Sequence, residues 1–289
     1  MRGESYRPGV EGFKSKMKEL EYEDGRNVVY YTYFVDKRDD LPSVLQEILD
    51  KKVDLIHTYS TPATVEAYKK TKSVPIVFGS MGDPLASKTV FSLEKSGTNV
   101  TGVNSLSSPL AAKRLEFLIE AIPSVKRVAF PFAPDDIPGL SSYNAVLEVA
   151  DKLKVKIIPY YISKDRSVKE TALAISRRDV DGIVISSDSL VWANLASYVE
   201  QAEKEKLPFA VFDKDMVLKG GLLGYGPDYF VTGEQSAVLV DKILRGARPT
   251  DLPIEIPRKI ILVVNLKTAK KIGLNFREEF LKKANMILE

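Results

Sequence analysis

The sequence contains no cysteine and a single histidine, His57, in 289 residues. The absence of cysteine excludes disulfides, thiolate metal sites and thiol nucleophiles. A single histidine cannot form a histidine metal cluster, and the residues around it show no nucleophile elbow. We therefore expect no catalytic site, no metal and no cofactor.

Long apolar runs and blocks of one charge are also missing. No run of 18 apolar residues is present, so no segment is expected to span a membrane, and the first ten residues lack the apolar centre of a secretory signal. The 42 basic and 39 acidic residues are spread along the chain, which argues against nucleic-acid binding. A globular chain of 289 residues exceeds the usual domain size of about 100–200 residues, so two lobes are expected.

Apolar spacing predicts strands and helices in alternation, which favours parallel sheets covered by helices on both faces. A run of β-branched and aromatic residues at Val28–Val35 is the first predicted strand. The predicted strands are 28–35, 53–57, 74–80, 126–132, 155–162, 180–186, 209–212 and 260–264. The predicted helices are 12–22, 41–51, 61–70, 142–153, 168–177, 189–206, 231–245, 266–273 and 277–288.

Two stretches of the chain match one another. Residues 53–83 and 180–215 both read as a strand, a hydroxyl-rich helix start, a helix, a proline-led strand and an acidic loop. This correspondence predicts two similar lobes. A strand at 126–132 precedes the first helix of the second set, whereas only residues 1–11 precede the helix predicted at 12–22. The opening strand of the first lobe is therefore expected to be short or missing.

In open parallel sheets, ligands bind beyond the carboxyl ends of the strands. Thr61 and Ser189 begin helices there, where free N–H groups favour an anion such as a carboxylate, although these hydroxyls could equally serve as caps. Asp83, beside Gly82, could pair with a ligand ammonium or could form an Asp-Pro turn. Asp188 and Asp213 are weaker candidates for pairing with a ligand ammonium.

Planar groups and glycines near the strand ends admit further interpretations. Tyr59, Trp192 and Tyr225 could stack a planar ligand or pack internally. The stretch 82–89, GDPLASKT, has the outline of a phosphate loop, but Ser87 replaces its second glycine, a proline removes one N–H, and an aspartate adds negative charge. Nucleotide binding is therefore not expected. The glycine-rich stretch 220–226 is interpreted as a crossing between lobes.

Several sequence blocks, taken in order, resemble one family. They are GFKSKMKELEYEDGRNV, VPIVFGSMGDPLAS, GTNVTGV, KRLEFLIEAIP, GGLLGYGPDY, DKILRGARPTDLPIE and NLKTAKKIGL. Over nearly its whole length the chain resembles the ABC-transporter substrate-binding proteins of the tryptophan/tyrosine-uptake type.

The resemblance implies an α/β protein with the type I periplasmic-binding-protein fold: two Rossmann-like lobes with parallel sheets, joined by a three-crossing hinge. The expected lobes are 1–103 with about 226–256, and 104–225 with about 257–289. Hinge closure would trap a small ligand, at best guess an aromatic amino acid, in the interlobe cleft. The protein would be an extracytoplasmic monomer that presents this ligand to a membrane permease.

Family members carry an export signal or lipobox that this sequence does not show. The resemblance assigns ligand contacts to Ser60 and Thr61, to Ser80, Gly82 and Asp83, and to the strand end at 186–188. Residues 4–7 are expected to stand where the tip of the opening strand would lie. The full set of expected ligand contacts is Tyr6, Tyr59, Ser60, Thr61, Ser80, Gly82, Asp83, Asn104, Phe132, Ser186, Ser187, Asp188, Asp213 and Tyr225.

Two other interpretations remain. A ligand-sensing domain of a regulatory or signalling system shares the fold, but it would need a DNA-binding or signalling segment that this sequence does not show. An α/β enzyme would need a nucleophile, a metal set or a cofactor loop.

Overall fold

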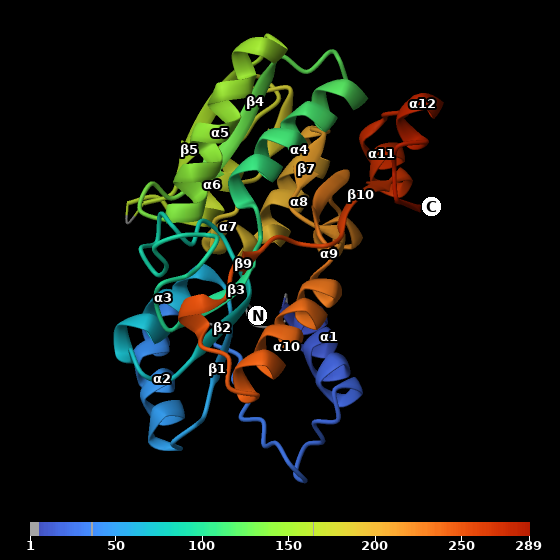
Figure 1. Ribbon diagram of the computed structural model, residues 1–289. Coiled ribbons are helices and arrows are strands. Elements are labelled where there is room, and N and C mark those ends of the chain that lie inside the picture. Colours follow the sequence, from blue (N-terminus) through green and yellow to red (C-terminus); the bar gives the residue numbers. More distant parts are fainter. Residues whose placement is uncertain (1–5, 36, 164) are drawn as a thin grey trace. The chain divides into compact units, whose positions relative to one another are not determined.

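The computed structural model describes residues 6–35, 37–163 and 165–289 (Figure 1). These residues form two compact units. Unit 1 comprises the described residues up to Leu106 together with Pro227–Lys259, and unit 2 comprises Ser107–Gly226 with Ile260–Glu289. The chain therefore passes between the units three times. Within the described ranges, no helix combines the length and the apolar character that a membrane span requires.

Unit 1 is built on a sheet with four strands among its described residues, in the order β1-β2-β3-β9. All three strand pairs are parallel. Strand β1 lies at one edge and pairs with β2 alone in the described chain. The strands are β1 (Ile56–Tyr59), β2 (Ile76–Met81), β3 (Val100–Asn104) and β9 (Ile254–Glu255).

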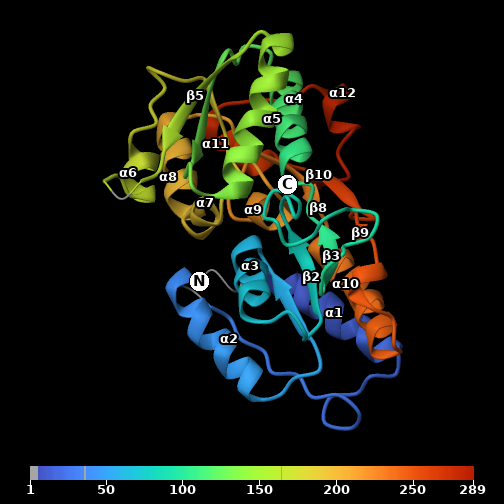
Figure 2. The ribbon, with the colours of Figure 1, turned by 60° about the vertical axis from the view of Figure 1, so that its left-hand side comes forward.

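Helices cover both faces of this sheet because the side chains of β2 alternate between two cores. Val77 packs in a cluster with Phe13 and Met17, whereas Ile76 and Phe78 pack in another cluster with residues of α2 and α3. Figure 2 shows α2 and α3 on one side of the strands and α1 and α10 on the other. The helices are α1 (Arg7–Glu19), η2 (Arg38–Asp40), α2 (Leu41–Asp50), α3 (Thr61–Lys70), α10 (Tyr229–Leu244) and η3 (Pro249–Asp251).

Helices α1 and α10 pack closely because small residues line their contact. A Cβ atom added at Gly12 would overlap the carbonyl oxygen of Phe230, and one added at Gly233 would overlap that of Gly9. Any side chain at these positions would therefore push the two helices apart.

Unit 2 contains a longer sheet, with seven strands in the described residues in the order β11-β10-β8-β7-β6-β4-β5. Its strands are β4 (Arg127–Phe132), β5 (Lys156–Tyr161), β6 (Gly182–Val184), β7 (Phe209–Val211), β8 (Leu223–Pro227), β10 (Ile260–Asn265) and β11 (Met286–Leu288). Its helices are α4 (Ser107–Ala121), α5 (Ile137–Leu153), α6 (Val168–Leu173), α7 (Ser189–Ala193), α8 (Leu195–Glu205), α9 (Lys214–Leu218), α11 (Leu266–Ile272) and α12 (Glu278–Leu281).

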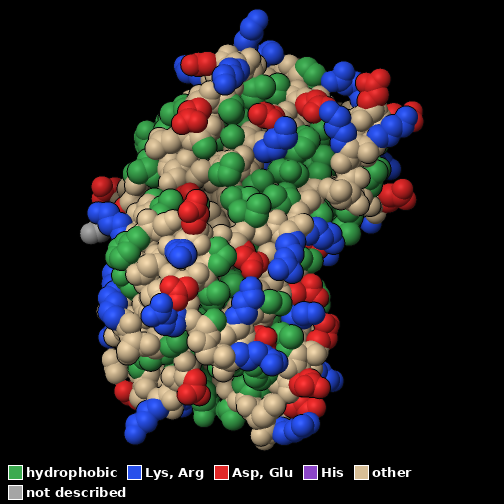
Figure 3. Space-filling model, in the orientation of Figure 1, with side chains coloured by type: hydrophobic (Ala, Val, Ile, Leu, Met, Phe, Trp, Pro, Cys, Tyr) green, Lys and Arg blue, Asp and Glu red, His purple; other side chains and the backbone are tan. Residues whose placement is uncertain are grey.

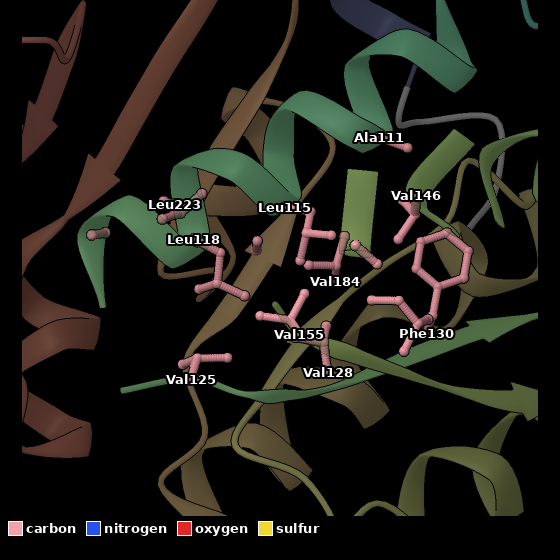
Figure 4. Packing of buried hydrophobic residues seen from close by; sticks show 14 of the residues in the cluster. Ala111, Leu115, Leu118, Val125, Val128, Phe130, Val146, Val155, Val184 and Leu223 are labelled. Atoms are coloured by element: carbon pink, nitrogen blue, oxygen red, sulfur yellow. The ribbon is translucent and has the colours of Figure 1, made fainter. Parts of the chain in front are cut away.

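The core of unit 2 lies between the central strands and helices α4 and α5. Leu115 and Leu118 of α4 and Val146 of α5 are fully buried against Val128 and Phe130 of β4 (Figure 4). Burial of such side chains contributes about 1.5–3 kcal/mol each. This packing fixes the positions of β4, β6 and β7, whose carboxyl ends carry polar residues.

The strand predicted at Val28–Val35 is wrong. Val28 makes one isolated bridge with Asp24, and residues 29–35 belong to no strand (Figure 1). The run has strong strand propensity, but a strand forms only where a neighbouring strand offers backbone partners. No strand among the described residues lies against this segment.

The helix predicted at 277–288 is also wrong. Helix α12 ends at Leu281, and β11 then pairs with β10. Asn285 directs this change, because its backbone N–H donates to Leu262 O at 2.8 Å and its Oδ1 accepts from Leu262 N at 2.7 Å. The helix predicted at 189–206 is divided at Asn194 into α7 and α8.

Candidate functional site: the strand ends of each unit

Two residues with unusual backbone angles stand at the carboxyl edge of the unit 1 sheet. Ser60 follows β1 with φ 99° and ψ 147°, and Asp83 follows β2 with φ 50°. The Ser60 conformation is almost confined to glycine, and such strain concentrates at binding sites. Strands β1 and β2 are neighbours, and Ser60 N donates to Ser80 O at 2.9 Å. Both strained residues therefore belong to one edge of one sheet.

The start of α3 is largely occupied by internal hydrogen bonds. Ser60 Oγ accepts from Ala63 N at 3.4 Å, and Thr64 N donates to Ser60 O. Pro62 carries no N–H. Thr61 Oγ1 donates to Gly82 O and accepts from Gly82 N, both at 3.1 Å. The predicted carboxylate contact at Ser60 and Thr61 therefore has few free donors, and both hydroxyls act within the fold.

Asp83 lies at the start of the long loop between β2 and β3, and the residue is partly exposed. Its carbonyl oxygen accepts from Ser87 N at 3.0 Å, and Ser87 Oγ donates to Pro84 O at 2.7 Å. These bonds make the segment a turn that begins directly after the buried Gly82. Ser80 is buried near the end of β2, and Asn104 ends β3, where its Oδ1 accepts from Leu106 N at 3.0 Å.

An aromatic cluster stands where β1 ends and α1 begins. Tyr6 stacks on Tyr59 with ring centroids 5.8 Å apart, and Tyr229 meets Tyr6 edge-on at 5.9 Å. A Cβ atom at either Gly9 or Gly79 would collide with the Tyr59 ring, so these glycines make room for it. Tyr59 is therefore packed internally, while Tyr6 is partly exposed beside it. Residues 4 and 5, also expected near this point, lie outside the described residues.

The Tyr59 hydroxyl is buried and has no hydrogen-bond partner in the described parts of the chain. Burial raises the pKa of this phenol, which therefore stays protonated. A buried donor without a partner is uncommon in a folded protein. It marks the end of β1 as a place where a further polar group would be favourable.

His57 has a structural role in β1. Its ring stacks on Phe13 with centroids 4.1 Å apart, and its Nε2 lies 2.9 Å from Ser236 Oγ. Ser236 Oγ donates to Gly233 O at 2.8 Å, so it accepts from His57, and the imidazole proton lies on Nε2. Burial lowers the pKa of His57 to about 3, which keeps the ring neutral.

In unit 2, two of the predicted contacts are fully buried and serve the fold. Asp188 accepts from Ala133 N and from Leu190 N, both at 2.6 Å, and so joins the loop after β4 to the start of α7. Ser186 Oγ donates to Pro131 O at 2.8 Å. These bonds connect the ends of β4 and β6.

Ser187, between these two residues, differs from both. Its hydroxyl oxygen is buried, and no partner for it is present in the described residues. A hydroxyl can donate one hydrogen bond and accept two. Of the three predicted contacts at this strand end, Ser187 has the strongest structural reason to meet a ligand.

Two further predicted contacts of unit 2 belong to its interior. Phe132 is buried and stacks on Tyr143 at 4.7 Å. Asp213 caps α9 by accepting from Met216 N at 2.9 Å. Burial raises the pKa of Asp213 to about 7. Both side chains therefore have structural roles inside unit 2.

Sequence reasoning missed Arg114, which is fully buried in α4 at the ends of β7 and β8. Its guanidinium lies 4.6 Å from the Phe212 ring centre, and its Nη1 donates to Tyr225 O at 3.3 Å. Tyr225 is partly buried and meets Phe117 edge-on, and Trp192 meets Phe212 edge-on. Position 114 falls on the apolar stripe of α4 with Leu110 and Leu118, and this periodicity was the signal available in the sequence.

Charge is mixed on the face of the molecule drawn in Figure 3. Figure 3 shows basic and acidic side chains interspersed on the face drawn, with no continuous patch of either sign. In the described ranges, no group of three or more histidine or acidic residues could hold a metal ion.

The comparison with protein families identifies the class. Residues 1–288 match the model of the family described as ABC transporter substrate binding protein. The chain belongs to this family of solute-binding proteins, which agrees with the resemblance in the sequence.

Two curated proteins are similar to this chain. A tyrosine-binding protein of Clostridioides difficile is 25% identical over 266 residues, which cover 91% of this chain and 76% of that protein. An uncharacterised protein of Rickettsia prowazekii is 20% identical over 237 residues, which cover 80% of this chain and 71% of that protein.

Solved structures confirm the fold. A domain from Streptococcus pneumoniae in complex with L-Trp has a TM-score of 0.89 at 21% identity and covers 98% of this chain and 96% of its own. A domain from Vibrio cholerae has a TM-score of 0.91 at 25% identity, with coverage of 99% and 96%. An arabinose-binding protein from Geobacillus stearothermophilus has a TM-score of 0.63 at 16% identity, with coverage of 93% and 94%. The chain has the type I periplasmic-binding-protein fold.

Proposed function

We propose that this protein binds an aromatic amino acid and presents it to the permease of an ABC importer outside the cytoplasm. Family membership over residues 1–288 and the similarity to a tyrosine-binding protein support this proposal. The structural observation that carries it is the pair of strained residues, Ser60 and Asp83, on adjacent strand ends of unit 1.

The ammonium, the carboxylate and the aromatic side chain of such a ligand each have a chemical counterpart among the strand-end residues. The Asp83 carboxylate suits the ligand ammonium, because a charged hydrogen bond contributes about 1.5–3 kcal/mol. The hydroxyl of Ser187 suits the ligand carboxylate, because a buried hydroxyl gains most from a new partner. Tyr6 and Tyr225 retain partly exposed rings that could contact an aromatic side chain.

Binding would act by stabilising one arrangement of the two units over others. A ligand shifts such an equilibrium only by its difference in affinity between the states. A receptor that works in this way needs no catalytic group, which agrees with the absence of a nucleophile motif in the sequence.

Titration calorimetry with L-tryptophan, L-tyrosine and L-phenylalanine tests the ligand class, with L-leucine, L-arabinose and a nucleoside as comparisons. We expect heat and a saturable isotherm with at least one aromatic amino acid. Absence of binding to all three, or tighter binding of a comparison ligand, would overturn the proposal.

The variant Asp83→Asn tests the ammonium contact, and Asp151→Asn on the exposed side of α5 is its matched control. We expect Kd to rise about 10–100-fold for Asp83→Asn, the equivalent of one lost charged hydrogen bond, and to stay unchanged for the control. Equal affinity in the two variants would show that Asp83 does not contact the ligand.

Delivery to a permease is tested separately. Deletion of the gene should abolish uptake of the radiolabelled amino acid, and reintroduction of the wild-type gene should restore it. Uptake that is unaffected by the deletion, despite tight binding in vitro, would favour a sensory role.

A further inference from the structure

The third passage of the chain between the units leaves the sheet of unit 1 after β9 and runs through residues 256–259 to β10. This third crossing is exposed at most of its positions, and Ile256 is 64% exposed. Pro257 within it carries no N–H. Few buried contacts hold a segment of this kind, so its order depends on the hydrogen bonds of its remaining backbone groups.

Gln235 of α10 makes these hydrogen bonds. The side chain is buried, and its Nε2 donates to Ile256 O at 3.0 Å and to Glu255 Oε2 at 3.1 Å. Its Oε1 accepts from Arg258 N at 2.7 Å. One amide therefore bonds the backbone on both sides of the proline, with both of its N–H groups and its oxygen in use. The third crossing is thereby joined to α10.

The second crossing, residues 227–228, is joined to the third. Asp228 N donates to Lys259 O at 3.0 Å, and the Lys259 ammonium lies 2.9 Å from Asp228 Oδ2. Asp228 is also the residue before α10, and its carbonyl oxygen accepts from Thr232 N in that helix. Both crossings are therefore attached to α10, one at the start of the helix and one at Gln235.

The first crossing, residues 105–106, is held in unit 1 by other bonds. Ser105 N donates to Met81 O at 2.9 Å, and Leu106 N donates to Asn104 Oδ1 at 3.0 Å. Leu106 has φ 53°, a left-handed conformation that persists for a bulky side chain only where the surroundings fix it. All three crossings are therefore fixed to unit 1.

On the unit 2 side the chain is fixed equally closely. A Cβ atom added at Gly226 would lie 2.0 Å from Phe212 O, so β8 packs tightly against the end of β7 up to this residue. Helix α4 begins directly after the first crossing, and β10 begins directly after the third. The backbone freedom between the units is therefore concentrated at three joins, 106–107, 226–227 and 259–260.

We propose that Gln235 is a positioning residue for ligand capture: it keeps the second and third crossings rigid with α10, so that the units turn only at the three joins. This inference rests on the proposed function, because such a receptor works by a change in the arrangement of its units. A loose crossing would have to be ordered whenever a ligand binds, and ordering one backbone residue weakens binding about 5–30-fold. The Gln235 amide removes this cost by ordering the crossing beforehand.

Gln235→Met tests this role, because methionine has a similar shape and no amide. The matched control is Gln201→Met in α8 of unit 2, where another buried glutamine donates to two backbone oxygens, those of Leu173 and Ile175. In the ligand-free proteins we expect the Arg258 amide to exchange its hydrogen at least about 10-fold faster in Gln235→Met and at the wild-type rate in the control. Circular dichroism reports whether both variants are folded.

Titration calorimetry with L-tryptophan, L-tyrosine and L-phenylalanine gives a second readout. We expect Gln235→Met to raise Kd about 5–10-fold, by the same factor for each amino acid that binds, because the crossing acts on the units and not on the ligand side chain. Gln201→Met should leave Kd unchanged. A factor that differs between the amino acids would show that Gln235 contacts the ligand, and would overturn the proposed role.

Lys259→Met tests the join between the second and third crossings without a change in the core, since this side chain is 56% exposed. The backbone bond from Asp228 remains. An exposed ion pair contributes little, so we expect Kd to rise only about 2-fold, again equally for each amino acid. The rise should disappear at high salt. A larger rise than in Gln235→Met would contradict the central place of the glutamine.

Three results would overturn the proposal. They are unchanged Arg258 exchange in Gln235→Met, an equal rise in Kd in the two glutamine variants, and slower Arg258 exchange in wild-type protein when the amino acid is added. The last would show that the crossing is not ordered before binding. Failure of the proposed function is distinguishable: no amino acid would then bind to the wild-type protein, and exchange in the ligand-free proteins would still test the role of Gln235.

Discussion

Both units are built on parallel sheets, but in the described residues the sheet of unit 1 has four strands and that of unit 2 has seven. In unit 2, β4 lies between β5 and β6 and carries much of the core. In unit 1, a segment with stronger strand propensity than β5 stays outside the sheet. Strand propensity alone therefore does not form a strand, because a strand also needs backbone hydrogen-bond partners in its neighbour.

The units also differ in the contacts that connect their helices and loops. Unit 1 depends on the close glycine contact of α1 with α10, whereas unit 2 joins its loops through buried carboxylates such as Asp188. Gly233 and His57 lie in unit 1, whereas Asp188 and Asp213 lie in unit 2. Because Trp192 is the only tryptophan and lies in unit 2, its fluorescence reports on that unit.

The largest effect is expected from Gly233→Ala in unit 1. The added methyl group would overlap the backbone of Gly9, so the free energy of unfolding should fall by about 3 kcal/mol. Urea unfolding followed by circular dichroism should show an early transition that Trp192 fluorescence does not share. Gly139→Ala in α5 is the control, since its methyl group meets only side-chain atoms at 3.3–3.5 Å. Coincident early transitions by both probes would show that the units unfold together.

Asp188→Ala should have the next largest effect, in unit 2. Removal of the carboxylate leaves the N–H groups of Ala133 and Leu190 without their acceptor, which costs about 2 kcal/mol. The Trp192 transition should shift to lower urea concentration. Asp188→Asn keeps one acceptor oxygen and should lose about half as much. A shift in circular dichroism alone would contradict this assignment to unit 2.

Asp213→Asn should change the pH dependence of unit 2. The pKa of this carboxyl is raised to about 7 by burial, above its ordinary 3.8. The folded state therefore binds the proton more tightly, and the contribution to stability is complete below about pH 4 and lost as the pH rises through about 7. The variant keeps the acceptor for Met216 N and should flatten this slope in the Trp192 transition. An unchanged slope between pH 4 and 7 would refute the shift.

His57→Gln should change the pH dependence of unit 1, in the direction opposite to that of Asp213 in unit 2. Burial lowers the pKa of His57 from 6.5 to about 3. The contribution of the neutral ring is complete above about pH 6.5 and is lost as the pH falls towards about 3. The variant retains a donor for Ser236 and should flatten the acid limb in circular dichroism, with no change in the Trp192 transition over this range.

Much of the fold could be predicted from the sequence. Apolar periodicity identified α2, α3, β2 and β4 closely, because each has a clear start signal and a buried face. The matching stretches 53–83 and 180–215 predicted two lobes of similar organisation. The family resemblance predicted an ABC-transporter substrate-binding protein.

The roles of the individual side chains were decided by the tertiary structure. Thr61, Asp188 and Asp213 stand at strand ends, as the sequence indicated, yet each is committed to hydrogen bonds within the fold. Burial of Arg114 against Phe212 depends on strands that are distant in sequence. Local pattern determines which segments form helices and which residues stand at their ends. Whether a polar group there serves the fold or remains available to a ligand depends on partners that only the packed chain brings together.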